Sequence, residues 1–326
     1  MRTREQAKAT LKTLALGLGL LAALGLQACS KGAKVYHVGV LSGLDYFAPI
    51  TDGFKEKMAE LGYVEGGNIT YDVQKTGVDP AAYKKVVENF VAAKVDLIFV
   101  FPTEAAITAK AVAQGSGIPV LFAAVFTENT GLINSVREPG GNITGVRWPG
   151  PDMALQRLEL IRELVPKARK IMVPYQKGYP IVQVQMEALR QAFITQHLTL
   201  IEMPVNNAAE LDAAMEHAGK EGAPDAVMTI IDPLAISPGV CGYAAKHGIP
   251  FGGNMASDAL FGSAPKSVPQ GKQAAFLADK ILKGVPAGSI PVVSAESHLE
   301  INYRVAKKLG LTVGEGLLSK ADEVIR

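Results

Sequence analysis

From residue 35 onward, short runs of apolar residues alternate with longer segments whose apolar residues recur every three or four positions. The first pattern is typical of buried β-strands, and the second of amphipathic helices packed on a sheet. The runs predict strands at 35–41, 69–73, 95–101, 120–123, 142–146, 170–173, 199–203, 226–231, 249–252 and 299–301. The periodic segments predict helices at 49–61, 80–93, 104–114, 152–164, 181–196, 208–219, 238–247, 270–282 and 303–309.

Strand and helix alternate in two series that meet near residue 148. Repeated strand–helix–strand order predicts parallel sheets with helices on both faces, because each crossover helix packs back on its sheet. The expected fold class is therefore α/β, with two Rossmann-like lobes joined by a multi-strand hinge. The segment Trp148-Pro149-Gly150-Pro151 is predicted as the first hinge, and Asp79 before Pro80 as the N-cap of its helix.

The first 28 residues carry the pattern of an export signal. Polar and basic residues at 1–13 precede an apolar run of 13 residues from Leu14 to Leu26, too short to span a bilayer. The run ends in Leu-Gln-Ala-Cys29, which resembles a bacterial lipobox; an ordinary signal peptide with a chance cysteine is the alternative. We expect cleavage after residue 28, lipidation of Cys29 and a lipidated tether at 29–34. The protein is then exported and lipid-anchored to a bacterial membrane, facing the periplasm or the cell exterior.

Composition and charge exclude several classes of protein. Apolar residues make up 48% of the 326 residues and charged residues 20%, which excludes a disordered chain. Four of the 33 basic and one of the 31 acidic residues lie in 1–28, so 29 basic and 30 acidic residues remain. This balance argues against nucleic-acid binding, which needs a basic face. Two cysteines are too few for a disulfide framework or a four-cysteine zinc site.

Motifs of common cofactor and catalytic sites are missing. Gly140 and Gly145 match the outer glycines of a phosphate-binding loop, but valine and arginine follow where lysine and serine or threonine are required. The five histidines are scattered, with none paired at metal-ligand spacing. Cys241 lies in a predicted helix and is interpreted as a small buried residue. We therefore predict no catalytic residue, no cofactor and no metal ligand.

Ligands of open parallel sheets bind beyond the carboxyl ends of the strands, and two facing sheets leave a cleft there. The residues that follow the predicted strands are therefore the candidates for ligand contacts. Ten of them are predicted to bind the ligand: Asp45, Tyr46, Phe47, Thr103, Glu104, Phe126, Thr127, Tyr175, Asp232 and Asn254.

The chemistry of these residues leaves more than one role open. Thr103 is predicted as the N-cap of its helix, where free backbone N–H groups also attract a ligand carboxylate. Glu104 complements the helix dipole but repels an anion. Asp232 suits a ligand ammonium group and a turn before proline equally, and Asn254 suits a polar contact or a loop cap. Each aromatic residue can be explained by packing, but the set favours an apolar or aromatic ligand. The set is Tyr46, Phe47, Phe126, Tyr175 and Tyr179.

Several stretches resemble the substrate-binding lipoproteins of ABC transporters of the tryptophan/tyrosine type. They follow in order over nearly the whole exported chain: 53–66, 95–98, 118–125, 139–145, 164–166, 271–275, 281–284 and 301–311. The chain departs from the family at three strand ends. The family usually has a turn that contains histidine and proline after the first strand, and residues 42–47 of this chain contain neither. Residues 174–180 also differ from the family pattern. Asp232 is not followed by the polar residue that is common in the family.

The resemblance implies a type I periplasmic binding protein fold with three passages between the lobes. One lobe is then formed by 35–147 with 264–292, and the other by 148–263 with 293–326. It further implies a protein without enzymatic activity, expected as a monomer, that captures a small ligand by hinge closure and serves an ABC permease and its ATPase.

We expect the ligand to be an amino acid or a small carboxylate with an apolar or aromatic part. A lipoprotein that presents its closed form to a membrane receptor is the alternative. A two-lobed racemase would need a second acid–base group facing Cys241. A repressor of the lac type is excluded, because the N-terminus carries a signal instead of a helix-turn-helix.

Overall fold

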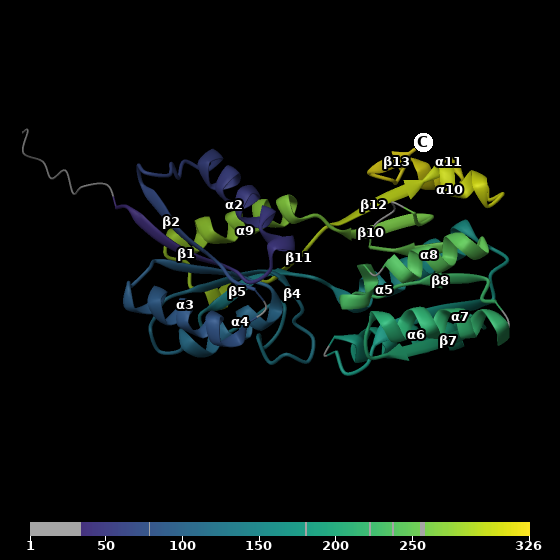
Figure 1. Cartoon of the computed structure of the whole chain (residues 1–326). Coiled ribbons are helices and arrows are strands. Elements are labelled where there is room, and N and C mark those ends of the chain that lie inside the picture. Colours follow the sequence, from purple (N-terminus) through teal and green to yellow (C-terminus); the bar gives the residue numbers. More distant parts are fainter. Residues whose placement is uncertain (1–33, 78, 180, 222, 237, 255–257) are drawn as a thin grey trace, which may run out of the picture.

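The computed structural model describes residues 34–77, 79–179, 181–221, 223–236, 238–254 and 258–326. Its two β-sheets lie side by side, each flanked by helices (Figure 1). The predicted signal peptide, the lipidation site Cys29 and the tether up to residue 33 lie outside the described residues. Within the described part of the chain, no helix has the length and apolar character needed to cross a membrane.

The first sheet is formed by β1 (Tyr36–Ser42), β2 (Ile69–Lys75), β3 (Leu97–Phe101), β4 (Val120–Val125), β5 (Ile143–Arg147) and β11 (Val293–Ser294). Its order is β11-β5-β4-β3-β1-β2, and all neighbouring strands run parallel. Along β3, Leu97 and Phe99 pack into one hydrophobic cluster, and Ile98 and Val100 into another. Both faces are therefore buried, which explains why the strand is an uninterrupted apolar run.

The second sheet is formed by β6 (Lys170–Gln176), β7 (Thr199–Val205), β8 (Ala226–Met228), β9 (Phe251–Gly253), β10 (Phe261–Pro265), β12 (Ser297–Asn302) and β13 (Glu323–Ile325). Its order is β13-β12-β10-β9-β8-β6-β7, with only β10 and β12 antiparallel among the described pairs. Ile171 and Val173 of β6 pack on one side and Met172 on the other. This sheet is also buried on both faces.

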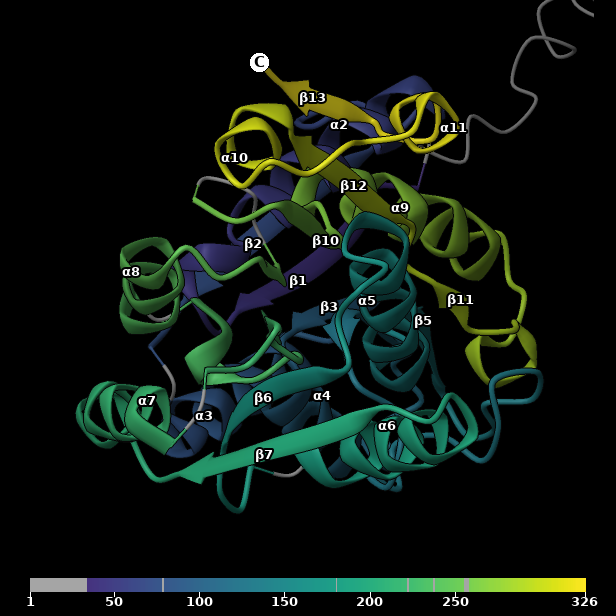
Figure 2. The same ribbon diagram turned by 90° about the vertical axis from the view of Figure 1, so that its right-hand side faces the viewer.

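The helices form the outer layers (Figures 1 and 2). Those of the first lobe are α2 (Pro49–Glu60), α3 (Pro80–Ala92), α4 (Thr103–Val112) and α9 (Ser267–Leu282). Those of the second are α5 (Gly150–Leu164), α6 (Val182–Thr195), α7 (Ala208–Glu221), α8 (Pro238–His247), α10 (Tyr303–Lys308) and α11 (Glu315–Leu318). In the first lobe α2 and α9 share one cluster while α3 and α4 share another. In the second, α5 and α6 share one and α7 and α8 another.

The α/β class and its strand–helix alternation are confirmed. Asp79 caps α3 as predicted, since its Oδ1 accepts a hydrogen bond of 2.9 Å from the backbone N–H of Ala81. Three short strands, β10, β11 and β13, are missing from the prediction. Their two to five residues are too few for a periodic pattern, and β10 contains glycine and proline.

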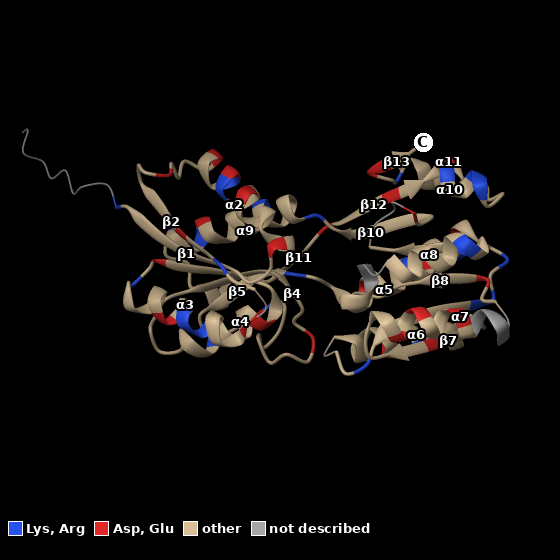
Figure 3. Ribbon diagram, in the orientation of Figure 1, with Lys and Arg blue, Asp and Glu red and all other residues tan. Residues whose placement is uncertain are grey.

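The chain passes between the sheets three times. It leaves the first sheet after β5, returns between β10 and α9, and leaves again between β11 and β12. Helix α9 packs against α2, more than two hundred residues earlier in the chain. Acidic and basic residues are interspersed over both lobes (Figure 3).

Candidate functional site

Tyr179 lies where strand ends of the two sheets approach each other. It follows β6, and its half-buried side chain packs against hydrophobic clusters of both lobes. Burial, together with the negative charges of Glu104 and Asp232, raises the pKa of its hydroxyl to about 12. The charges of two predicted site residues, one at the start of α4 and one after β8, therefore act on the same tyrosine.

A row of aromatic side chains extends from this junction. Tyr46 and Phe47 lie in a short 3₁₀ helix, η1 (Asp45–Phe47), that follows β1. The ring centroids are 5.1 Å apart for Tyr46 and Phe47, 5.8 Å for Phe47 and Trp148, and 5.8 Å for Phe126 and Trp148. All three contacts are edge-to-face, a preferred geometry for aromatic pairs. Three of the predicted residues thus belong to one aromatic row.

Trp148 is the centre of this row and is absent from the predicted site. Its indole N–H donates a hydrogen bond of 2.6 Å to Oε1 of Gln270 in α9. A Cβ at Gly150, two residues on, would lie 3.4 Å from the Phe126 ring and 3.5 Å from the amide carbon of Gln185 in α6. The sequence contained a sign of this role, because the only tryptophan lies two residues after the predicted strand at 142–146.

The prediction that Thr103 caps α4 is wrong. Thr103 is the first residue of the helix, Pro102 occupies the cap position, and no side-chain cap is formed. Its hydroxyl instead accepts a hydrogen bond of 3.1 Å from the backbone N–H of Phe126. Thr103 is buried, so this bond joins the ends of β3 and β4 and fixes the start of the aromatic row. The next residue, Glu104, is half-buried, and its negative charge acts on Tyr179.

A cluster of charges lies beside Thr127. The backbone N–H of Thr127 donates to Oε2 of Glu128 at 3.1 Å, and Nη1 of Arg147 lies 2.5 Å from Oε1 of the same carboxylate. Nη2 of Arg147 lies 3.8 Å from Oδ2 of Asp152 in the first turn of α5. Arg147 therefore pairs with an acidic residue on each side of the predicted hinge.

Asp232 is buried and connects the end of β6 with its own turn after β8. Its Oδ2 accepts a hydrogen bond of 2.6 Å from the N–H of Gln176, and Oδ1 accepts one of 3.0 Å from the N–H of Leu234. The neighbouring Ile231 is bonded through its N–H and C=O to the side chain of Gln185, at 3.0 and 2.9 Å. Asp232 therefore has the turn role, and it also lies close to Tyr179.

Asn254 follows β9 and accepts a hydrogen bond from Nη2 of Arg157, a fully buried residue of α5. Arg157 also donates to the C=O of Ser263 at 2.6 Å and to the C=O of Thr229 at 2.9 Å. Burial lowers the pKa of this guanidinium, and Asp232 opposes the shift. Arg157 is absent from the predicted site, because an arginine inside an amphipathic helix gives no sign of burial.

Tyr175 and Asp45 are not part of the aromatic row. The hydroxyl of Tyr175 donates a hydrogen bond of 2.8 Å to Oε2 of Glu202, which also pairs with Arg190 at 2.7 Å. Tyr175 lines a pocket of about 330 Å³ beside α6. Asp45 is exposed at the start of η1.

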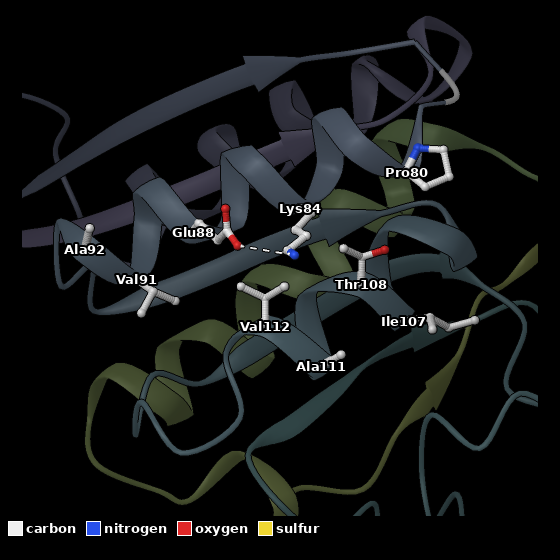
Figure 4. A pocket seen from close by; sticks show the side chains of 9 residues that line it. All are labelled: Pro80, Lys84, Glu88, Val91, Ala92, Ile107, Thr108, Ala111 and Val112. Carbon is white, nitrogen blue, oxygen red and sulfur yellow. Dashed lines mark ion pairs between the residues drawn. The ribbon is translucent and has the colours of Figure 1, made fainter.

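A groove of about 810 Å³ lies between α3 and α4 on the first lobe (Figure 4). Nine residues line it: Pro80, Lys84, Glu88, Val91, Ala92, Ile107, Thr108, Ala111 and Val112. Its two charged groups pair with each other, with 3.8 Å between Nζ of Lys84 and Oε1 of Glu88. The ten predicted residues do not line this groove, so it is distinct from the junction at Tyr179.

A sequence profile described as "ABC transporter substrate binding protein" matches residues 38–325. The chain belongs to this family of ABC transporter substrate-binding proteins. Members of the family are solute-binding proteins and not enzymes, which confirms the predicted family and the absence of an enzymatic role. ABC substrate-binding proteins are generally extracytoplasmic.

Individual relatives agree with this assignment. A tyrosine-binding protein of Clostridioides difficile (strain R20291) is 28% identical over 268 residues, covering 79% of this chain and 76% of the relative. The structure of an ABC domain from Streptococcus pneumonia in complex with L-Trp matches with a TM-score of 0.75 and 24% identity. The match covers 90% of this chain and 100% of that chain. A ligand-free, open substrate binding protein from Clostridium difficile has the same TM-score and identity, covering 89% and 99%. The fold is that of type I periplasmic binding proteins.

Proposed function

We propose that this substrate-binding protein captures an aromatic amino acid between its two lobes and delivers it to an ABC importer. The observation that carries the proposal is the edge-to-face row Phe47–Trp148–Phe126, which shares a hydrophobic cluster with Tyr179. The negative charges of Glu104 and Asp232, one from each lobe, act on this tyrosine. Aromatic rings contact a ligand ring by stacking or edge-to-face packing, and carboxylates bind an ammonium group. The tyrosine-binding relative and the neighbour with bound L-Trp support the same class of ligand.

Closure of the lobes about the three passages is the proposed step that buries the ligand. A bound ligand shifts the equilibrium between open and closed forms only by the difference in its affinity for the two. Phe47 and Phe126 belong to the first lobe and Asp232 to the second. Contacts with both sides therefore form fully only in the closed state, and this state is the one proposed to dock on the permease and its ATPase.

The fluorescence of Trp148 tests this proposal directly, because it is the only tryptophan of the chain. Binding of L-Tyr or L-Phe is expected to change the Trp148 emission with saturation. At a ligand concentration one hundredfold above Kd, the free energy of unfolding should rise by about 2.7 kcal/mol. L-Arg and ribose are the matched controls and should leave both signals unchanged. Saturable binding of ribose in place of the aromatic amino acids would contradict the proposal.

The role of Asp232 is tested by a pair of matched variants. Asp232 and Asp225 both accept hydrogen bonds from backbone N–H groups of β6, Asp232 at its end and Asp225 at its start. Asp232→Asn should weaken L-Tyr binding by at least about tenfold, because a charge-assisted hydrogen bond to the ligand ammonium is lost. Asp225→Asn should leave the affinity unchanged, as measured by titration calorimetry. Equal affinities in the two variants would remove Asp232 from the site.

Transport is tested in cells. Deleting the gene should abolish uptake of the labelled amino acid at low concentration, and a plasmid copy should restore it. If the deletion leaves uptake unchanged although the purified protein binds the amino acid, the receptor-presenting role is favoured instead.

A further inference from the structure

Two carboxylates lie side by side at the edge of the second sheet. Strands β12 and β13 pair in parallel, and the register places Glu300 next to Glu323. His298 precedes Glu300 by two residues on β12, so its side chain points to the same face of the sheet. Like charges placed directly opposite each other on neighbouring strands destabilise a sheet. This edge therefore favours the binding of a cation.

The distances between these groups suit a single metal ion. One ligand atom each of His298, Glu300 and Glu323 lie within 4.8 Å of one another. Two ligands about 2.1 Å from one zinc ion are at most roughly 4.2 Å apart, so small side-chain rotations suffice. Nδ1 of His298 also lies 3.8 Å from Oδ2 of Asp322, which places another carboxylate at the same imidazole.

Solvent reaches the cluster, and one protein cation already lies beside it. The side chains of Glu323 and His298 are 57% and 30% exposed, which leaves a path for an ion from solvent. The ammonium group of Lys266, which follows β10, pairs with Glu300. A carboxylate has about four acceptor positions, so Glu300 can keep this pair and still ligate a metal. Lys266 nevertheless repels a second cation and should weaken its binding.

We propose that His298, Glu300 and Glu323 bind a divalent transition-metal ion of the zinc type. One imidazole with two carboxylates is a ligand set that Zn²⁺ accepts and that leaves a position for water. The ion would reinforce the attachment of β13, an edge strand of three residues, to its neighbour β12. Local sequence patterns do not predict this site, because Glu323 lies 23 residues beyond Glu300 and only the strand pairing brings them together.

Calorimetric titration of the tag-free, chelator-treated full chain with ZnCl₂ tests the site. We expect one Zn²⁺ per chain and a higher melting temperature with Zn²⁺ than with chelator. His298→Asn and Glu323→Gln should each weaken binding by at least about tenfold, because each removes a ligand. His197→Asn is the matched control: this histidine is exposed elsewhere, at φ 53°, a conformation that asparagine tolerates. It should leave the affinity unchanged.

Lys266→Met provides a test of opposite sign. Removing the competing ammonium group should strengthen Zn²⁺ binding several-fold, whereas general damage to the protein would weaken it. Absence of stoichiometric binding in the native chain would overturn the proposal. Binding that survives both His298→Asn and Glu323→Gln would overturn it as well.

Discussion

At the scale of single residues, the buried Arg157 organises the second lobe. Its guanidinium donates to the carbonyl groups of Thr229 and Ser263 and to the side-chain oxygen of Asn254, which lie after β8, within β10 and after β9. Burying an arginine is unfavourable unless its charge and its donors are satisfied. Asp232 supplies a nearby negative charge, so Arg157 links two of the predicted site residues without being a predicted one itself.

Arg157→Met should lower the free energy of unfolding by about 3 kcal/mol or more. The substitution preserves much of the apolar volume but removes the donor from two buried carbonyl groups and from the half-buried Asn254. Urea denaturation measures the loss. Arg162→Met is the matched control on the same helix, because Arg162 is exposed, and it should change stability by less than about 0.5 kcal/mol. A similar small effect for both variants would show that the buried network contributes little.

At the scale of secondary-structure elements, α2 and α9 make an unusually close contact. A Cβ at Gly53 would lie 2.1 Å from the carbonyl oxygen of Val268, and one at Gly271 would lie 2.0 Å from that of Ile50. These are backbone atoms and cannot rotate away. The glycines let the two helices meet closely enough to bury their shared face, which fixes the segment that returns by the second passage to the first lobe.

Gly271→Ala should destabilise the protein by about 1–3 kcal/mol, because the added methyl group must push the two helices apart. Gly242→Ala is the matched control. Gly242 also lies inside a helix, α8, but its added Cβ would meet open space. Alanine has the higher helix propensity, so this variant should gain up to about 1 kcal/mol in urea denaturation. Destabilisation of the same size in both variants would contradict the close-contact argument.

At the scale of the whole molecule, two neighbouring residues anchor the first passage between the lobes. Arg147 pairs with Glu128 in the first lobe and with Asp152 in α5. Trp148, next in the chain, is tied to Gln270 in α9. Arg147 and Trp148 therefore lie in the segment about which the two lobes would rotate relative to each other. The predicted lipid on Cys29 would attach the whole molecule to a membrane.

Cys29→Ser should move the protein from the membrane fraction to the soluble fraction. Each buried methylene of a lipid chain contributes about 0.8 kcal/mol, so losing the lipid removes the anchor. Fractionation followed by immunoblotting measures the change. Cys241→Ser is the matched control, since Cys241 is the only other cysteine and lies in α8, and it should stay membrane-bound. Continued membrane association of Cys29→Ser would refute the lipobox interpretation.

The element boundaries show how local information limits prediction. Helix α2 begins at Pro49 and α3 at Pro80 as expected, because proline and the Asp79 cap are signals within the helix start itself. Thr103 has the composition of a cap, yet its hydroxyl bonds the backbone of Phe126 on the neighbouring strand. Phe126, whose N–H group donates to the hydroxyl of Thr103, lies 23 residues further along the chain, so a pattern of neighbouring residues does not include it.

The sequence by itself determined the α/β class, the alternation of the longer strands and helices and the family, because these depend on local hydrophobic periodicity and on short motifs. It also selected Phe47, Phe126, Glu104 and Asp232, since ligands gather at the ends of parallel strands. Only the tertiary structure decided which of these residues meet. The order of strands in each sheet and the three passages of the chain between the sheets set the distances between these side chains, because they place groups that are far apart along the sequence next to each other.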